Sequence, residues 1–111
     1  MNTPLHMAAH ALNPKWYVPR DKKKTPNNDQ EVKDGFMAFI SKVYTSEESA
    51  IIRSQFIQFV RLRGPRFSTQ ECKEDRATLA QIDPIGWWDL YGDDAPHLKQ
   101  LAVKLLSQVG R

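Results

Sequence analysis

The fold is decided by residues 83–108, which read DPIGWWDLYGDDAPHLKQLAVKLLSQ. Asp83-Pro84 stops any preceding helix, because the residue before a proline disfavours helical geometry. Two adjacent indoles, Trp87 and Trp88, then fall on a short helical turn. The second proline opens another helix, since proline suits the first helical position and an aspartate before it can act as a cap. This last segment predicts an amphipathic helix with the apolar face Leu98, Leu101, Ala102, Leu105 and Val109.

The first part of the chain predicts two further helices separated by a basic loop. Pro4–Leu12 is rich in alanine, has apolar residues at helical spacing and is ended by Asn13-Pro14. Residues 15–28 are polar, contain a run of three lysines at 22–24, and predict a flexible loop. A second helix is expected over about 29–44, because its apolar residues recur with helical period.

Capping pairs predict the next two helices. Thr45 with Glu48, and Ser68 with Glu71, both match the pattern in which a hydroxyl caps a helix and an acid three residues later reaches back. Gly64-Pro65 stops the first of these helices. The second runs to Ile82 and, with few apolar positions, is expected to be the most exposed, whereas the first has the apolar face Ile52, Phe56, Phe59 and Val60.

The predicted fold class is all-α. No stretch shows apolar alternation with a period of two between turn signals, so strands are not expected. A chain of 111 residues makes at most one small domain. We therefore expect residues 1–111 to form one small irregular bundle of about five helices, with 15–28 as its flexible loop.

Composition restricts the function classes. The formal net charge is +3, which is a weak attraction to polyanions. Cys72 is the single cysteine and cannot form an internal disulfide, as expected in a reducing compartment. No secretory signal pattern begins the chain, and no apolar run approaches the roughly 18–20 residues that span a bilayer. We expect an intracellular protein, nuclear or cytoplasmic, with no membrane partner.

Few residue patterns suggest chemistry. His6 and His10 have the i, i+4 spacing of two metal ligands, but no third ligand lies near them in the sequence. Cys72 has no histidine that would activate a thiol. The acids occupy predicted first turns and caps, where the helix dipole favours them. These acids include Glu47, Glu48, Glu71, Glu74, Asp75, Asp83, Asp89, Asp93 and Asp94. We expect no catalytic residue, metal, cofactor or small-molecule substrate.

Basic residues form two groups that are candidates for weak DNA contact. One lies in the first loop, beside Trp16 and Tyr17, whose rings can stack on bases. The other surrounds the Gly64-Pro65 break. The candidate contacts are Lys22, Lys23, Lys24, Arg61, Arg63 and Arg66.

The tryptophan pair suggests an interaction surface. Each indole carries on the order of 200 Å² of surface, so a minimal turn cannot bury both unless other elements cover them. We expect at least one to lie at an interface, either with the last helix or with a partner, because aromatic residues dominate binding energy at interfaces. The candidate interaction residues are Trp87, Trp88, Tyr91, Leu98, Leu101 and Leu105.

Three ordered segments resemble DNA transposases of the hAT superfamily, of the plant type. Residues 4–17, PLHMAAHALNPKWY, are similar to the family's LHxAAxxLNPxxxY segment. Gly64-Pro65-Arg66-Phe67 resembles its Gly-x-Phe element. Residues 83–108 resemble its tryptophan turn and its Leu-Ala-x-x-x-Leu-Ser-Gln helix.

The resemblance implies a cut-and-paste transposase whose ribonuclease-H-like core is interrupted by a helical insertion. The matching stretch corresponds to the end of that insertion and the approach to the final catalytic helix. The family continues into a Glu-Arg pair that supplies the third metal-binding acid, whereas this sequence ends at Val109-Gly110-Arg111. Transposition chemistry is therefore not expected.

The leading expectation is a non-catalytic, transposon-derived fragment that serves protein–protein interaction or dimerisation. Its expected partners are a second copy of itself or a related transposase-like protein. The alternatives are weak non-specific DNA binding through the basic loops, and residual metal-dependent nuclease activity from the acids around Trp87.

Overall fold

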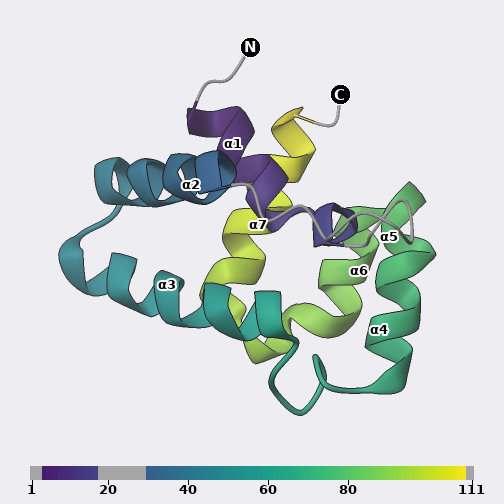
Figure 1. The fold of residues 1–111 in the computed structure, drawn as a ribbon. Coiled ribbons are helices and arrows are strands. Elements are labelled where there is room, and N and C mark those ends of the chain that lie inside the picture. Colours follow the sequence, from purple (N-terminus) through teal and green to yellow (C-terminus); the bar gives the residue numbers. More distant parts are fainter. Residues whose placement is uncertain (1–3, 18–29, 110–111) are drawn as a thin grey trace.

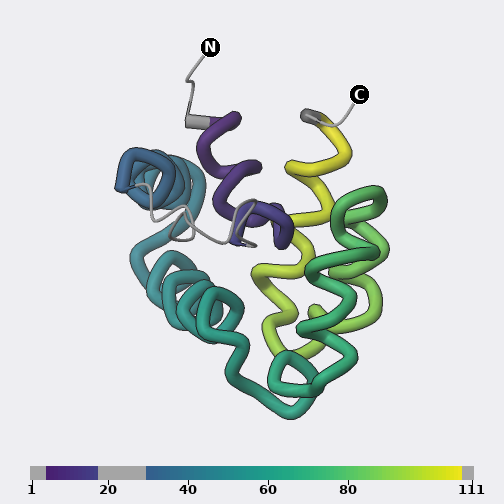
Figure 2. The backbone as a smooth tube through the Cα atoms, turned by 45° about the vertical axis from the view of Figure 1, so that its right-hand side comes forward, coloured from purple at the N-terminus to yellow at the C-terminus, as the bar shows by residue number. Residues whose placement is uncertain are grey.

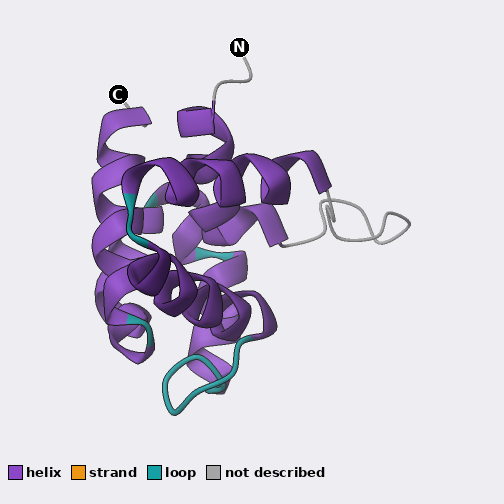
Figure 3. Ribbon diagram, turned by 90° about the vertical axis from the view of Figure 1, so that its left-hand side faces the viewer, coloured by secondary structure: helices purple, strands orange, loops and turns teal. Residues whose placement is uncertain are grey.

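The computed structural model describes residues 4–17 and 30–109, and throughout these residues the regular elements are helices, with no strand among them (Figure 3). The all-α prediction is confirmed for this part of the chain. The elements are α1 (Pro4–Leu12), η1 (Pro14–Tyr17), α2 (Gln30–Val43), α3 (Ser46–Arg61), α4 (Gln70–Ala77), α5 (Leu79–Ile82), α6 (Pro84–Tyr91), η2 (Gly92–Asp94) and α7 (Pro96–Val109).

The last helix lies at the centre of the arrangement. Helix α7 contacts α1, α3 and α6, and α1 in turn packs along α2 (Figure 1). Helix α3 forms one outer side of the molecule, and α4 with α5 forms the other (Figure 2). The two ends of the described chain, α1 and the end of α7, lie on the same side of the molecule (Figure 1).

Helix α3 begins and ends through local hydrogen bonds. The predicted cap is confirmed, because the Thr45 hydroxyl accepts the Glu48 N–H at 3.2 Å and donates to the Glu48 carboxylate at 3.1 Å. At the other end the helix stops two residues before the predicted Gly64-Pro65 break, at Leu62, which adopts left-handed geometry with φ 52°. Its N–H donates to Phe59, and the next N–H donates to Gln58, which satisfies the terminal carbonyls of α3.

The predicted fourth helix differs from the structure in two places. The capping hydroxyl belongs to Thr69 rather than Ser68, which donates instead to the Gly64 carbonyl at 2.6 Å. The helix also divides into α4 and α5 at Thr78, whose backbone leaves helical geometry at φ −121° and ψ −70°. The Trp turn is a full helix, α6, so the bundle has more pieces than the five predicted.

The first three residues of the predicted loop at 15–28 are helical. Residues 15–17 belong to η1, which the Tyr17 hydroxyl ties to α1 by donating to the Ala11 carbonyl at 2.5 Å. The remaining residues of that prediction lie outside the described part of the chain.

An aromatic cluster centred on Phe59 joins the elements across the bundle. Its ring centroid lies 4.7 Å from Trp88, 5.8 Å from Trp87, 6.2 Å from Phe67 and 5.5 Å from Tyr17. Aromatic pairs at these separations add attraction beyond the burial of their surface. Phe59 therefore connects α3 to the loop before α4, to α6 and to η1 in one contact set.

Both indole N–H groups find backbone acceptors within the core. Trp88 donates to the Leu12 carbonyl at 2.8 Å and so ties α6 to the end of α1. Trp87 donates to the Cys72 carbonyl at 3.3 Å in α4. Because an unpaired buried N–H is costly, these bonds orient both rings as well as satisfy them.

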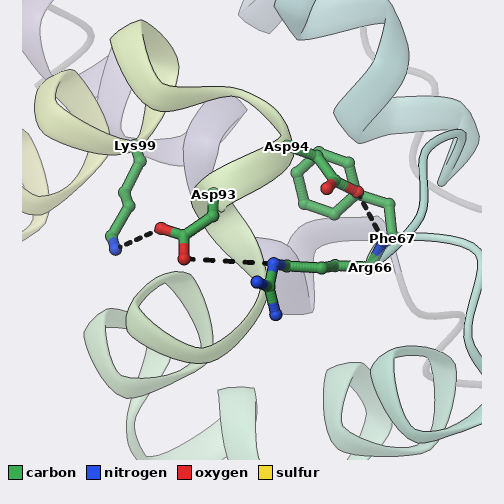
Figure 4. A network of polar contacts seen from close by, with 5 residues as sticks. All are labelled: Arg66, Phe67, Asp93, Asp94 and Lys99. Atoms are coloured by element: carbon green, nitrogen blue, oxygen red, sulfur yellow. Dashed lines mark hydrogen bonds and ion pairs between the residues drawn. The ribbon is translucent and has the colours of Figure 1, made fainter.

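A single carboxylate holds the loop between α3 and α4. Asp94 accepts the backbone N–H groups of Arg66 and Phe67, each at 2.8 Å (Figure 4). The loop passes so close that a Cβ on Gly64 would lie 2.5 Å from the Asp94 carboxylate, and Gly64 has φ +139°. Only glycine suits this position, since both its conformation and the space require the missing side chain.

Removal of the Phe59 ring should cost the fold more than any surface change on the same helix. We expect Phe59→Ala to lower the free energy of unfolding by about 3–5 kcal/mol, because a large cavity replaces a shared aromatic contact. The exposed neighbour Ile57→Ala should change it by less than about 0.5 kcal/mol. Urea denaturation followed by circular dichroism checks both values, and equal losses would contradict the role of Phe59.

Asp94 and its neighbour Asp93 provide a matched pair for testing the loop. Asp94→Ala should lower the free energy of unfolding by about 1–3 kcal/mol, because two backbone donors lose their acceptor. Asp93 instead bonds Lys99 at 2.9 Å on the surface, and this bond holds the pKa of Asp93 below its usual value. Asp93→Ala should therefore cost much less in the same denaturation assay, and the reverse order would overturn this assignment.

Candidate interaction surface

The residues predicted to form an interaction surface lie almost entirely in the core. Trp87 and Trp88 are both 0% exposed, so neither ring is on the surface where a partner could reach it. Of the two expected alternatives, contact within the chain fits this burial, because Phe59 and Phe67 cover the two rings and α6 packs on α7. The leucines of α7 predicted to join that surface are also buried: Leu98, Leu101 and Leu105.

Tyr91, the remaining predicted interaction residue, is partly exposed but has a partner in its own chain. Its hydroxyl donates to the Asp75 carboxylate and so ties α6 to α4. Burial and this hydrogen bond raise the pKa of Tyr91 well above its usual value. The bond thus has a structural role.

The candidate DNA contacts are only partly within the described residues. Lys22, Lys23 and Lys24 lie outside them. Arg61, Arg63 and Arg66 are exposed around the end of α3, and the Arg66 Nε atom lies 3.9 Å from Asp93 (Figure 4). Arg61 and Arg63 thus also present exposed side chains at this turn.

The two rings named as candidates for stacking on bases are packed within the chain. Tyr17 contacts Phe59 edge to face, and burial raises its pKa far above the usual value. Trp16 is partly buried, with its ring centroid 5.0 Å from that of His10. Burial is the main cause of a lowered pKa at His10.

The titratable groups have mainly structural partners. In addition to Asp75 and Asp94, Asp83 caps α6 by accepting the Gly86 N–H at 2.9 Å. Among the described residues, no three His, Cys, Asp or Glu side chains are grouped so that they could hold a metal ion. The same residues include no helix long and apolar enough to cross a membrane.

The exposed apolar side chains identify a different surface. The large ones are Val43, Ile51, Ile57, Ile82 and Leu90. Two of the five belong to α3, where Ile51 is 43% and Ile57 is 54% exposed. Both lie away from the buried residues of that helix, which are Ser49, Ile52, Phe56 and Phe59.

We define the outer α3 face by the exposed residues on the side of the helix opposite its buried stripe. Ser54 lies at its middle, with Ile51 and Ile57 on either side along the helix axis. Glu47 and Arg61 mark its two ends, each seven residues from Ser54 and therefore nearly aligned with it. The face consists of Glu47, Ala50, Ile51, Ser54, Ile57, Gln58 and Arg61.

Sequence reasoning missed this face although its signal was present. The apolar face predicted for α3 contains Ile52, Phe56, Phe59 and Val60, which occupy one side of the helix. Ile51 and Ile57 do not fit that periodicity, and apolar residues out of phase with a core stripe indicate a second apolar face. The aromatic residues of α6 suggest an interaction surface there instead, but Trp87 and Trp88 lie in the core.

Comparison with protein-family models, with curated proteins and with solved structures finds no match to this chain. The geometry therefore supports an exposed, mixed apolar and charged helix face as the candidate site.

Cys72 should behave as an inert core thiol. It is buried at 0% exposure, and burial raises its pKa to about 12. At pH 8 the thiol should remain protonated, so labelling by Ellman's reagent should be at least about a hundredfold slower in the native protein than in urea. Similar rates in the two states would contradict the burial of Cys72.

Proposed function

We propose that this protein is a non-catalytic protein–protein interaction module that uses the outer α3 face. The observation that carries the proposal is the exposure of Ile51 and Ile57 on a helix whose opposite side is fully packed. Ser54, between them, and Ala50, about one turn before Ser54, have small side chains and let another backbone approach closely. An apolar centre between charged ends is also the usual composition of a protein interface.

The positions of the acids support a non-catalytic role. Asp75, Asp83 and Asp94 each accept hydrogen bonds that hold the fold, from Tyr91, Gly86, and the α3–α4 loop respectively. Hydrogen bonding within the fold therefore explains the positions of these three carboxylates. The proposal needs no chemistry from them.

We further propose that the module derives from a hAT-type transposase, as part of its helical insertion and C-terminal region. The ordered motifs of residues 4–17, 64–67 and 83–108 support this origin. Its partner is then a second copy or a related transposase-like protein. A buried thiol at Cys72 is consistent with our proposed location inside the cell, in the nucleus or cytoplasm.

Weak DNA binding is kept as the second candidate because Arg61 and Arg63 are exposed together at the end of α3. Phosphate contacts of this kind would give binding that weakens steeply with salt. A fluorescence anisotropy titration of a labelled duplex at low and physiological salt tests it. Absent or salt-insensitive binding would remove this candidate.

A matched pair of exposed apolar residues tests the interaction module. We expect Ile57→Asp to weaken association by about tenfold or more, because a charge replaces an apolar contact at the centre of the face. Leu90→Asp on α6 is the control, since Leu90 is 55% exposed and lies outside the outer α3 face. Sedimentation equilibrium over about 10 μM to 1 mM provides the measurement.

The same experiment is repeated with the C-terminal region of a hAT transposase added. A monomer at every concentration, both alone and in the mixture, would contradict the proposed function. If Leu90→Asp weakens association as much as Ile57→Asp does, the outer α3 face is excluded as the site of association.

A further inference from the structure

We propose that the outer α3 face pairs with the same face of a second copy, with the two helices antiparallel about a twofold axis at Ser54. The inference rests on the proposed function and names the partner of that surface. It is carried by the internal symmetry of the face, in which residues on one side of Ser54 complement those on the other.

The register follows from residue spacing along α3. With Ser54 on the axis, Ile51 lies opposite Ile57 of the partner copy, since each is three residues from the centre. Glu47 lies opposite Arg61 of the partner copy, since each is seven residues away. Each pair occurs twice in the dimer, because a twofold interface brings the same surface patch of both copies together.

The charges select the antiparallel orientation. Glu47 lies in the first turn of α3 and Arg61 in the last, which also suits the helix dipole at both ends. In a parallel pair the two Glu47 side chains would meet, as would the two Arg61 side chains. The antiparallel pair instead places an acid beside a base at each end.

The remaining charges of α3 lie beside the contact and not in it. Glu48 turns toward Thr45, to which it is hydrogen bonded, and it belongs to the flank of the helix. Arg53 is exposed on the other flank, about 100° around the helix from Ser54. The centre of the contact is therefore uncharged, with Ala50, Ile57 and Gln58 adjoining Ser54.

A small self-complementary helix face fits a second copy better than an unrelated protein. The order acid, isoleucine, serine, isoleucine, base complements its own reversed copy. The remaining pair of the face sets the small Ala50 opposite the longer, uncharged Gln58 of the partner copy. One pair of helices is at the low end of interface sizes, below about 1,200 Å², where complexes are weak and transient. We therefore expect a dissociation constant in the micromolar range or weaker.

Charge reversal tests the register directly. Glu47→Arg and Arg61→Glu should each weaken self-association by about tenfold at low salt, because each change places like charges together at both ends. The double variant Glu47→Arg/Arg61→Glu should restore it, and an equimolar mixture of the two single variants should form a heterodimer. Sedimentation equilibrium measures all four samples.

The control is Glu71→Arg, which makes the same charge change in the first turn of α4, outside the outer α3 face. It should leave self-association unchanged. Circular dichroism of every variant shows whether the fold is retained, and a variant that has lost helix is replaced by Glu47→Gln or Arg61→Gln, for which a smaller loss of association is expected.

The outcomes separate this inference from the proposed function. If Ile57→Asp weakens association but neither charge reversal does, the antiparallel pair is overturned and the interaction module still stands. The same conclusion follows if the single charge reversals weaken association and the double variant does not restore it. Binding only to the transposase region, with no self-association, would also overturn the pair alone. Wild-type protein that remains monomeric and binds nothing would overturn both.

Discussion

The contact of Phe59 with the two tryptophans is the constraint on which the rest of this structure depends. It brings α3, α6 and η1 together at one point, and the hydrogen bond from Trp88 to Leu12 then fixes α6 against α1, 76 positions earlier in the chain. Because the rings fill the centre, α7 can bury its leucines between them and the N-terminal helices. The connections elsewhere adapt to this packing. The loop between α3 and α4, for example, is held by Asp94 of η2, the short element that follows α6.

The same constraint determines which side of α3 remains free. Helix α3 commits Ile52, Phe56 and Phe59 to the core, so its outer side can have no further contact within the described chain without displacing them. The isoleucines on that outer side, Ile51 and Ile57, remain 43% and 54% exposed in the folded chain. Their presence is better explained by a partner, although single exposed apolar residues are common on protein surfaces. The arrangement of charges around them gives this surface a direction as well as an apolar centre.

The proposed relation to hAT transposases concerns the origin of the chain, and the proposed interaction surface concerns its present use. The motif residues that suggest the relation, including Trp87, Trp88 and Leu101, are core residues in this structure. A shared core would preserve a helical framework without preserving catalysis. The proposed interaction instead depends on Ile51, Ser54 and Ile57, none of which belongs to those motifs. The proposed origin and the proposed interaction are therefore independent of each other.

Local signals in the sequence determined the helical class, the cap at Thr45, the breaks at Asn13-Pro14 and Asp83-Pro84, and the buried faces of α3 and α7. These depend on interactions within a few residues, such as a hydroxyl reaching the next turn or a proline lacking an N–H. The burial of both indoles, the carboxylate clamp of Asp94 and the break at Thr78 were decided by tertiary structure. The first two depend on Phe59 and on the Arg66–Phe67 backbone, which are brought near by folding and not by sequence spacing. For the same reason the sequence indicated which side of α3 is buried, whereas only the packed structure showed that Ile51 and Ile57 on its other side remain exposed.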